Sequence, residues 1–200
     1  MIMLEYDNIK YEECKEVYPP AEDTFLLIDN LILNENMDVL EIGGGTGIVS
    51  IAAAIKAKNV DVCDINPHAI KCIKHNIKLN ECKNISIIRS DLFENIDKHY
   101  DLILFNTPYL PVDEEEHVDD EYSKAWDGGA DGRKVIDRFI KEAKNYLKED
   151  GIIQLVQSSL SDNQKSIEML EEQGFNAQIT AVEHIFFEDI TLITAKHNLT

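Results

Sequence analysis

The sequence lacks a long apolar run, and no stretch approaches the ~18 consecutive apolar residues that a membrane-spanning helix needs. It also lacks a signal-peptide pattern, because its first residues, MIMLEYDNIKYEECK, contain no basic region followed by an apolar core. From these two absences we expect a cytoplasmic protein.

Basic residues are few, with 19 lysines and arginines against 38 aspartates and glutamates and a formal net charge of −19. The lysines are scattered and form no basic cluster, so the overall field would repel a phosphate backbone. Free DNA or RNA is therefore a poor candidate substrate, and a basic protein partner fits the charge better. Adaptation to a saline or acidic cytoplasm is an alternative explanation of the same charge.

The four cysteines contain no C-x-x-C pair; they are Cys14, Cys63, Cys72 and Cys82. Cys63 lies in an apolar run, where a buried free thiol is expected. Because the spacing matches neither a zinc motif nor a disulfide framework, we expect neither in this chain.

A content of 44% hydrophobic residues in 200 residues is enough for one globular domain, which we assign to residues 1–200. Within residues 1–36 we expect a helix at 21–33 that packs on the core. Strands are predicted at 37–42, 59–64, 85–90, 100–105, 151–158, 175–183 and 189–196. Helices are predicted between them at 46–56, 67–79, 132–147 and 162–173.

This alternation of continuous apolar strands with helices indicates an α/β fold with a parallel sheet covered on both faces. The connection between the last two strands is too short for a crossover helix, so these strands must form an antiparallel hairpin. The prediction is therefore a mixed seven-stranded sheet.

A glycine-rich loop follows the first of these strands in the sequence DVLEIGGGTG, residues 38–47. Glycines at this place permit a tight turn and a close approach of the backbone to a ligand. The dinucleotide fingerprint G-x-G-x-x-G fails, because its last position holds Ile48. The spacing instead places Glu41 before Gly43, Gly45 and Gly47.

Acidic residues also end the next two predicted strands, at Asp64 and in the sequence S-D-L that contains Asp91 and Leu92. A carboxylate at the position of Asp64 can accept hydrogen bonds from both hydroxyls of a ribose. The alternative is that these are turn glycines and solvated, helix-capping acids.

The loop resembles motif I of class I S-adenosylmethionine-dependent methyltransferases, which have a Rossmann-like fold. The resemblance implies that Gly43, Gly45 and Gly47 pass the amino acid part of the cofactor. It also implies that Asp91 bonds the adenine amine and that the amide of Leu92 meets a ring nitrogen.

The fourth predicted strand ends on Asn106, at the edge where open α/β sheets bind ligands. The side-chain oxygen of Asn106 and the backbone carbonyl of Thr107 can accept the two N–H groups of a planar NH2. Pro108 stiffens the turn, and Tyr109 offers a flat face to the substrate. This clamp would orient the nitrogen towards a methyl donor and needs no strong base. In isolation, Asn106 is better explained as a turn-forming residue after a strand. Its position one strand beyond the acid of the third strand favours the clamp instead.

The sequence N-T-P-Y resembles the N-P-P-Y motif of methyltransferases that act on glutamine amides or adenine amines, with Thr107 in place of proline. VYPPAEDTFLL (17–27) and AWDGGADGRKVIDRF (125–139) resemble segments of the small branch of HemK-like protein glutamine methyltransferases. The resemblance implies methylation of the Gly-Gly-Gln loop of a class I translation release factor, together with a small zinc-binding activator protein.

The resemblance also places Thr24 near the cofactor and Tyr18 and Glu22 at the entrance of the site. Trp126 either shapes a substrate channel or packs its loop. The acid run 113–121 is interpreted as a solvated loop, and the sharper alternative is a lid that meets a basic surface of the release factor.

Three other functions remain open from the sequence. An adenine-N6 methyltransferase would use the same clamp, but the negative charge and the absence of a target-recognition domain oppose it. A non-catalytic binding module is opposed by the complete set of acids and Asn106. Methylation of a protein lysine is a minor alternative, because such a site can admit an amine.

Overall fold

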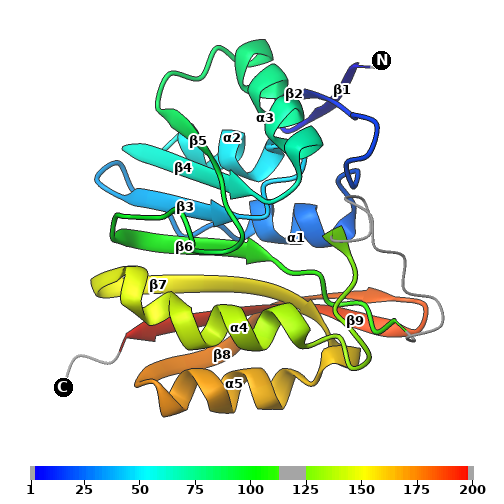
Figure 1. Ribbon diagram of the computed structural model, residues 1–200, viewed down its shortest axis with the longest axis vertical. Helices are drawn as coiled ribbons and strands as arrows, with labels where there is room; N and C mark the ends of the chain where they lie inside the picture. The colour runs from blue at the N-terminus through cyan, green and yellow to red at the C-terminus, as the bar shows by residue number, and fades with distance from the viewer. Residues whose placement is uncertain (1–2, 113–124, 198–200) are drawn as a thin grey trace.

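A seven-stranded mixed sheet forms the centre of the computed structural model, which describes residues 3–112 and 125–197 (Figure 1). The strand order is β5-β4-β3-β6-β7-β9-β8, and only β9 runs antiparallel to its neighbours. The strands are β3 (Asp38–Ile42), β4 (Asn59–Asp64), β5 (Ile85–Arg89), β6 (Tyr100–Asn106), β7 (Leu147–Ser158), β8 (Phe175–Ile185) and β9 (Glu188–His197). The predicted mixed sheet with a closing hairpin is confirmed.

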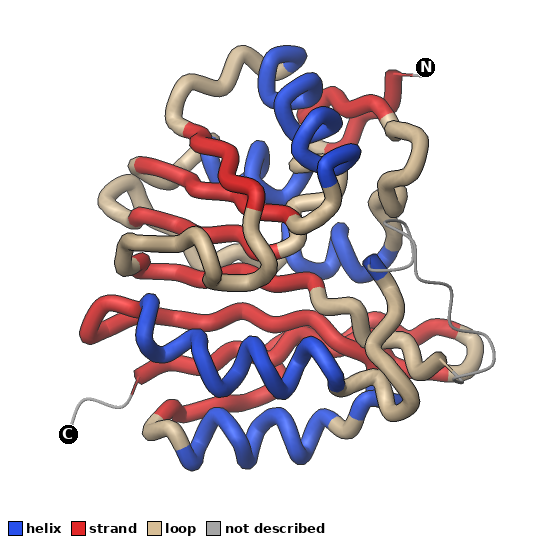
Figure 2. The backbone as a smooth tube through the Cα atoms, in the orientation of Figure 1, coloured by secondary structure: helices blue, strands red, loops and turns tan. Residues whose placement is uncertain are grey.

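Helices cover both faces of this sheet (Figure 2). In the view of Figure 1, α4 and α5 lie side by side in front of β7 and β8, and α1 and α2 lie behind the sheet. The helices are α1 (Glu22–Asp29), α2 (Ile48–Ala54), α3 (Pro67–Leu79), α4 (Lys134–Ala143) and α5 (Asn163–Glu172). None of these described helices has the length and apolar character needed to cross a membrane.

Local sequence explains where several helices begin and end. Asn66 caps α3 by accepting a hydrogen bond from the backbone N–H of His68 at 2.8 Å, and Pro67 occupies the first helical position. Asp162 caps α5 in the same way, through the N–H of Lys165 at 3.0 Å. The chain leaves α5 through Gly174, at a φ of 90° that favours glycine.

Two strands were missed by the sequence analysis: β1 (Met3–Tyr6) and β2 (Ile9–Glu12), which form an antiparallel hairpin. The predicted helix at 21–33 is shorter, because only Glu22–Asp29 is helical. The predicted helix at 132–147 is also shorter, since α4 passes into a 3₁₀ turn, η2 (Lys144–Tyr146), and β7 starts at Leu147.

The expectation that the chain has no disulfide is wrong, because Cys14 and Cys72 form one, with their Cα atoms 5.9 Å apart. The two residues are separated by 58 positions, so their spacing in the sequence gives no sign of the pairing. The fold brings them together by laying the segment after β2 along α3. Cys63 is a buried free thiol, as expected, and Cys82 is also free.

The middle glycine of the loop predicts a steric sensitivity. A Cβ on Gly44 would overlap Val62 Cγ2 and lie 2.9 Å from Ile73 Cδ1. We expect Gly44→Ala to lower the free energy of unfolding by ~1–3 kcal/mol, measured by urea denaturation, because the core is overpacked. Val62→Ala removes the overlapping methyl, so the double variant should lose less than the sum of the two single losses. Additive losses would contradict this explanation.

Candidate active site

A cavity of about 310 Å³ lies at the carboxyl ends of β3, β4 and β6. Parallel strands direct their carboxyl ends to one edge of a sheet, which brings the polar residues that end them into one place. The predicted residues that line this larger cavity are Tyr18, Thr24, Glu41, Gly43, Gly45, Asp64, Asp91, Leu92, Asn106 and Pro108.

A smaller cavity of about 30 Å³ shares Tyr18, Asn106 and Ala125 with the larger one. Its other walls are Asp23, Thr107, Tyr109, Leu110 and Trp126. Of the predicted residues, Thr107, Tyr109 and Trp126 therefore line only the smaller cavity, whereas Tyr18 and Asn106 line both.

Two predicted site residues lie outside both cavities. Gly47 instead precedes α2 at a φ of 84°, and a Cβ there would lie 3.2 Å from Ile73 Cα. A residue without a side chain is therefore needed at this position for close packing against α3. Glu22 lines neither cavity, and its side chain is exposed at the start of α1.

The carboxyl group of Glu41 is buried, and burial raises its pKa from the ordinary 4.5 to about 8. The Ser50 hydroxyl donates a hydrogen bond to it and opposes the shift, whereas the negative charge of Asp64 adds to it. This shift favours the protonated form of the carboxyl at neutral pH. A cation placed beside it would favour its ionised form.

Backbone N–H groups hold the carboxylate of Asp64 in a fixed orientation. Its Oδ2 accepts from Gly45 N at 2.9 Å, and its Oδ1 accepts from Asn66 N at 2.8 Å. A carboxylate has about four acceptor positions, and these two bonds fix the directions in which they face.

Arg138 of α4 lies across the cavity from β5 and is a residue that the sequence analysis missed. Its guanidinium approaches both carboxylate oxygens of Asp91 at 3.4 Å. Leu92, next to Asp91, has a φ of 46°, an uncommon conformation for leucine. The helical periodicity of α4 does not show that Arg138 contacts Asp91, which follows β5. Only the fold reveals this contact.

The side-chain oxygen of Asn106 is the one buried side-chain N or O atom without a hydrogen-bond partner in the part of the chain that the structure describes. Such an atom costs about 1–3 kcal/mol when it stays unpaired. Unpaired buried groups are rare in native proteins, and each one calls for an explanation. Because Asn106 lines both cavities, its oxygen is the candidate acceptor for a bound molecule.

Thr107 fixes the turn after Asn106 by bonding the neighbouring strand β7. Its backbone N–H and its hydroxyl both donate to the carbonyl oxygen of Val156, at 3.2 and 2.9 Å. A proline at this position could make neither bond. The threonine therefore replaces the rigidity of a second proline with two hydrogen bonds to the sheet.

Asp23 is a second residue that the sequence analysis missed. It is 5% exposed, accepts from Thr24 N at 2.6 Å and accepts from the Tyr109 hydroxyl at 3.2 Å. Burial, and then the charge of Asp23, raise the pKa of Tyr109. Asp23 thus connects the start of α1 to the ring that we expect to face the substrate, a connection between residues 86 positions apart.

Trp126 lines the smaller cavity, and its carbonyl oxygen accepts from Leu110 N at 3.0 Å. This location favours the substrate-channel interpretation of Trp126 over simple loop packing. The acid run 113–121, with its possible lid, lies outside the described residues.

The mixed sheet with its larger cavity at the carboxyl edge is the architecture of a Rossmann-like methyltransferase. The chain belongs to the methyltransferase small domain family, whose sequence model matches residues 22–122. In total, the fold, the glycine loop and the family match all identify the same class of enzyme.

Relatives in this class are similar over most of the chain. A Methanocaldococcus jannaschii protein, to which the activity of a protein N5-glutamine methyltransferase is attributed, is 49% identical over 97% of this chain and 98% of its own. Human methyltransferase HEMK2 is 33% identical over 80% of this chain and 79% of its own.

Among solved structures, the E. cuniculi Mtq2–Trm112 complex, described as responsible for the methylation of the eRF1 translation termination factor, is similar with a TM-score of 0.71 and 26% identity. The match covers 92% of this chain and 99% of that chain. The M. jannaschii tRNA m1G37 methyltransferase has a TM-score of 0.70 at 24% identity and shows similarity of fold alone.

The raised pKa of Glu41 predicts how stability depends on pH. The folded chain holds this proton up to pH of about 8, whereas the unfolded chain releases it near 4.5, so the contribution of Glu41 to stability falls as the pH rises between these values. Glu41→Gln has no such proton. We therefore expect the variant to gain stability relative to the wild type from pH 5 to pH 8, measured by urea denaturation. A constant difference over this range would contradict the assignment.

Proposed function

We propose that this protein transfers a methyl group from S-adenosylmethionine to the side-chain nitrogen of the glutamine in the Gly-Gly-Gln motif of a class I translation release factor. The observation that carries the proposal is the unpaired Oδ1 of Asn106, a residue that lines both cavities. The names of the relatives and the similarity to the Mtq2 chain support the same assignment.

The residues of the larger cavity fit the chemistry of this cofactor. The oriented carboxylate of Asp64 would accept from the ribose hydroxyls, and Asp91 with the Leu92 amide would hold the adenine. Gly43 and Gly45 let the backbone approach the amino acid part, whose ammonium group would favour the ionised form of Glu41. When bound, the cofactor supplies an electrophilic methyl group on a positively charged sulfur.

Asn106 and Thr107 would orient the acceptor nitrogen. The Asn106 Oδ1 accepts one N–H of the glutamine amide, and the backbone carbonyl of Thr107 accepts the other. With both N–H groups held, the nitrogen lone pair is directed towards the larger cavity, and the ring of Tyr109 covers the planar amide. Catalysis then rests mainly on orientation, and the surplus proton leaves after transfer.

A protein acceptor is favoured over nucleic acid by the charge of −19 and by an exposed apolar tip on the β8–β9 hairpin. Phe186 and Phe187 at this tip are 99% and 95% exposed. Because Ile190 of β9 pairs with Ser158 at the end of β7, the tip extends from the same edge of the sheet as Asn106. Exposed aromatic pairs of this kind mark surfaces for protein contact.

Mass spectrometry of the release factor's Gly-Gly-Gln peptide, after incubation with labelled S-adenosylmethionine, tests the proposal directly. The assay should be run with and without a small zinc-binding activator of the Trm112 type, which we propose as a partner. We expect a single added methyl group on the glutamine nitrogen. Label in DNA adenine or in lysine, with none in the glutamine, would overturn the assignment.

The clamp predicts a selective loss of transfer. Asn106→Ala removes the only side-chain acceptor that we assign to the substrate nitrogen, so the transfer rate should fall by on the order of 100-fold. Cofactor affinity, measured by calorimetry, should stay largely unchanged. Asn176→Ala, at an exposed position of β8, is the matched control and should keep full activity. Full activity of Asn106→Ala would refute the orientation mechanism.

The hairpin tip predicts a loss that depends on the size of the substrate. Phe186→Ser with Phe187→Ser should raise the KM for the whole release factor by about tenfold, the equivalent of ~1.4 kcal/mol of docking energy. The KM for a short Gly-Gly-Gln peptide should not change. Ile55→Ser is the control, because Ile55 is 74% exposed but follows α2 at the opposite edge of the sheet. Equal effects on both substrates would show that the tip is no docking surface.

A further inference from the structure

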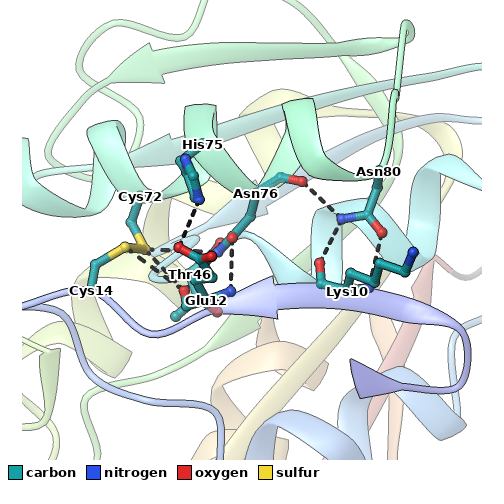
Figure 3. Close-up of polar contacts among 8 residues, drawn as sticks. All are labelled: Lys10, Glu12, Cys14, Thr46, Cys72, His75, Asn76 and Asn80. Atoms are coloured by element: carbon teal, nitrogen blue, oxygen red, sulfur yellow. Dashed lines mark hydrogen bonds and ion pairs between the residues drawn. A yellow bond between two sulfur atoms is a disulfide. The ribbon is translucent and has the colours of Figure 1, made fainter. Parts of the chain in front are cut away.

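One stripe of α3 holds the N-terminal segment in place (Figure 3). Cys72 and Asn76 of α3 and the C-cap residue Asn80 follow one another at intervals of four. They meet three residues of the segment at intervals of two, which are Cys14, Glu12 and Lys10 respectively. An interval of four keeps one face of a helix, and an interval of two keeps one side of a strand. The two periods match along about two helical turns and form a ladder.

The two asparagines act as substitutes for a neighbouring strand. Asn80 accepts from Lys10 N at 3.0 Å and donates to Lys10 O at 2.7 Å. Asn76 accepts from Glu12 N at 2.9 Å and donates to Glu12 O at 3.1 Å. A carboxamide both donates and accepts, so each asparagine satisfies a whole peptide group of β2.

Asn76 also connects the ladder to the cofactor cavity. Its side chain has no exposed surface, and its nitrogen donates to the carbonyl oxygen of Thr46 at 2.9 Å. Thr46 belongs to the glycine loop and lines the larger cavity. One buried side chain therefore joins β2, α3 and the loop that we assign to the cofactor.

The Cys14–Cys72 disulfide is the last rung, and the chain passes from it directly to the cavity. We name residues 14–24 the strap. Val17 of the strap is 5% exposed and packs against Ala69 and Cys72, and Asn66 Nδ2 donates to Glu16 O at 2.7 Å. Four strap residues then line the larger cavity: Val17, Tyr18, Pro20 and Thr24.

We infer that this ladder is a positioning device for cofactor binding, and that the Cys14–Cys72 disulfide sets the cofactor affinity by fixing the strap over the larger cavity. The inference rests on the proposed cofactor but not on the identity of the acceptor. Without the covalent rung, the strap is held at this end by the packing of Val17 and by single hydrogen bonds. It then occupies its closed position for a smaller fraction of time, and the apparent affinity falls by that fraction.

The redox step is an ordinary thiol–disulfide exchange with a dithiol reductant. A reductant thiolate attacks the sulfur of Cys14, which is the less buried of the two, and the S–S bond breaks with the electron pair on the sulfur of Cys72. The second reductant thiol then displaces Cys14. Both cysteines take up protons, and the reductant becomes a cyclic disulfide.

Calorimetry of the full chain with S-adenosylmethionine and with S-adenosylhomocysteine, before and after treatment with dithiothreitol, tests this inference. We expect the Kd to rise by on the order of tenfold on reduction. Cys14→Ser should show the weaker affinity under both conditions. Cys82→Ser is the control, because Cys82 is free and a serine hydroxyl can keep the bond that its thiol donates to the Asn80 carbonyl. This variant should respond to dithiothreitol as the wild type does.

Hydrogen exchange measured without any ligand gives a second readout. Amides of the strap should lose protection on reduction and in Cys14→Ser, while those of β6 should not. Asn80→Ala removes one non-covalent rung far from the cavity and should weaken cofactor binding in the same direction. Unchanged affinity and unchanged strap protection in the reduced chain would overturn the inference. A different result would separate the two proposals: the oxidised chain binds neither ligand, but its strap still loses protection on reduction. In that case the proposed cofactor is wrong, while the ladder still fixes the strap.

Discussion

The side-chain oxygen of Asn106 is buried at the carboxyl edge of the sheet without a hydrogen-bond partner among the described residues, at a cost of about 1–3 kcal/mol to the folded state. The central position of β6, bonded to β3 on one side and β7 on the other, holds the residue there. Thr107 secures the following turn by its two bonds to Val156. Asn106 also lines both cavities, so the proposed function depends on this one oxygen.

Acidic side chains determine the electrostatics of the larger cavity. Three acids from three neighbouring strand ends face it, and each is controlled differently. Burial raises the pKa of Glu41, backbone N–H groups orient Asp64, and Arg138 lies against Asp91. A ligand that carries positive charge would favour the ionised form of Glu41. Residues of the strap form part of the wall of this cavity, so the N-terminal segment contributes to the site together with the sheet.

Sequence patterns predicted the features that depend on residues close together in the sequence. The strand at 59–64, the helix at 67–79 with its Asn66 cap, and the positions of Glu41, Asp64, Asp91 and Asn106 at strand ends agree with the structure. The β1–β2 hairpin was missed because its short strands give little periodic signal. The Cys14–Cys72 pair, the Asp23–Tyr109 bond and the Arg138–Asp91 contact each join residues distant in the chain, so no local pattern reveals them. The sequence analysis assigned Glu22 to the entrance of the site. In the structure Glu22 lines neither cavity, and its neighbour Asp23 is buried and lines the smaller one.

The central claim is that Asn106 Oδ1 and the Thr107 carbonyl receive the two N–H groups of the acceptor amide. A crystal structure of the protein with S-adenosylhomocysteine and a Gly-Gly-Gln peptide tests this most directly. The account predicts the glutamine nitrogen within hydrogen-bond distance, about 2.7–3.2 Å, of both oxygens. A structure in which the glutamine nitrogen bonds other groups, with Asn106 Oδ1 still unpaired or satisfied by the protein, would contradict it.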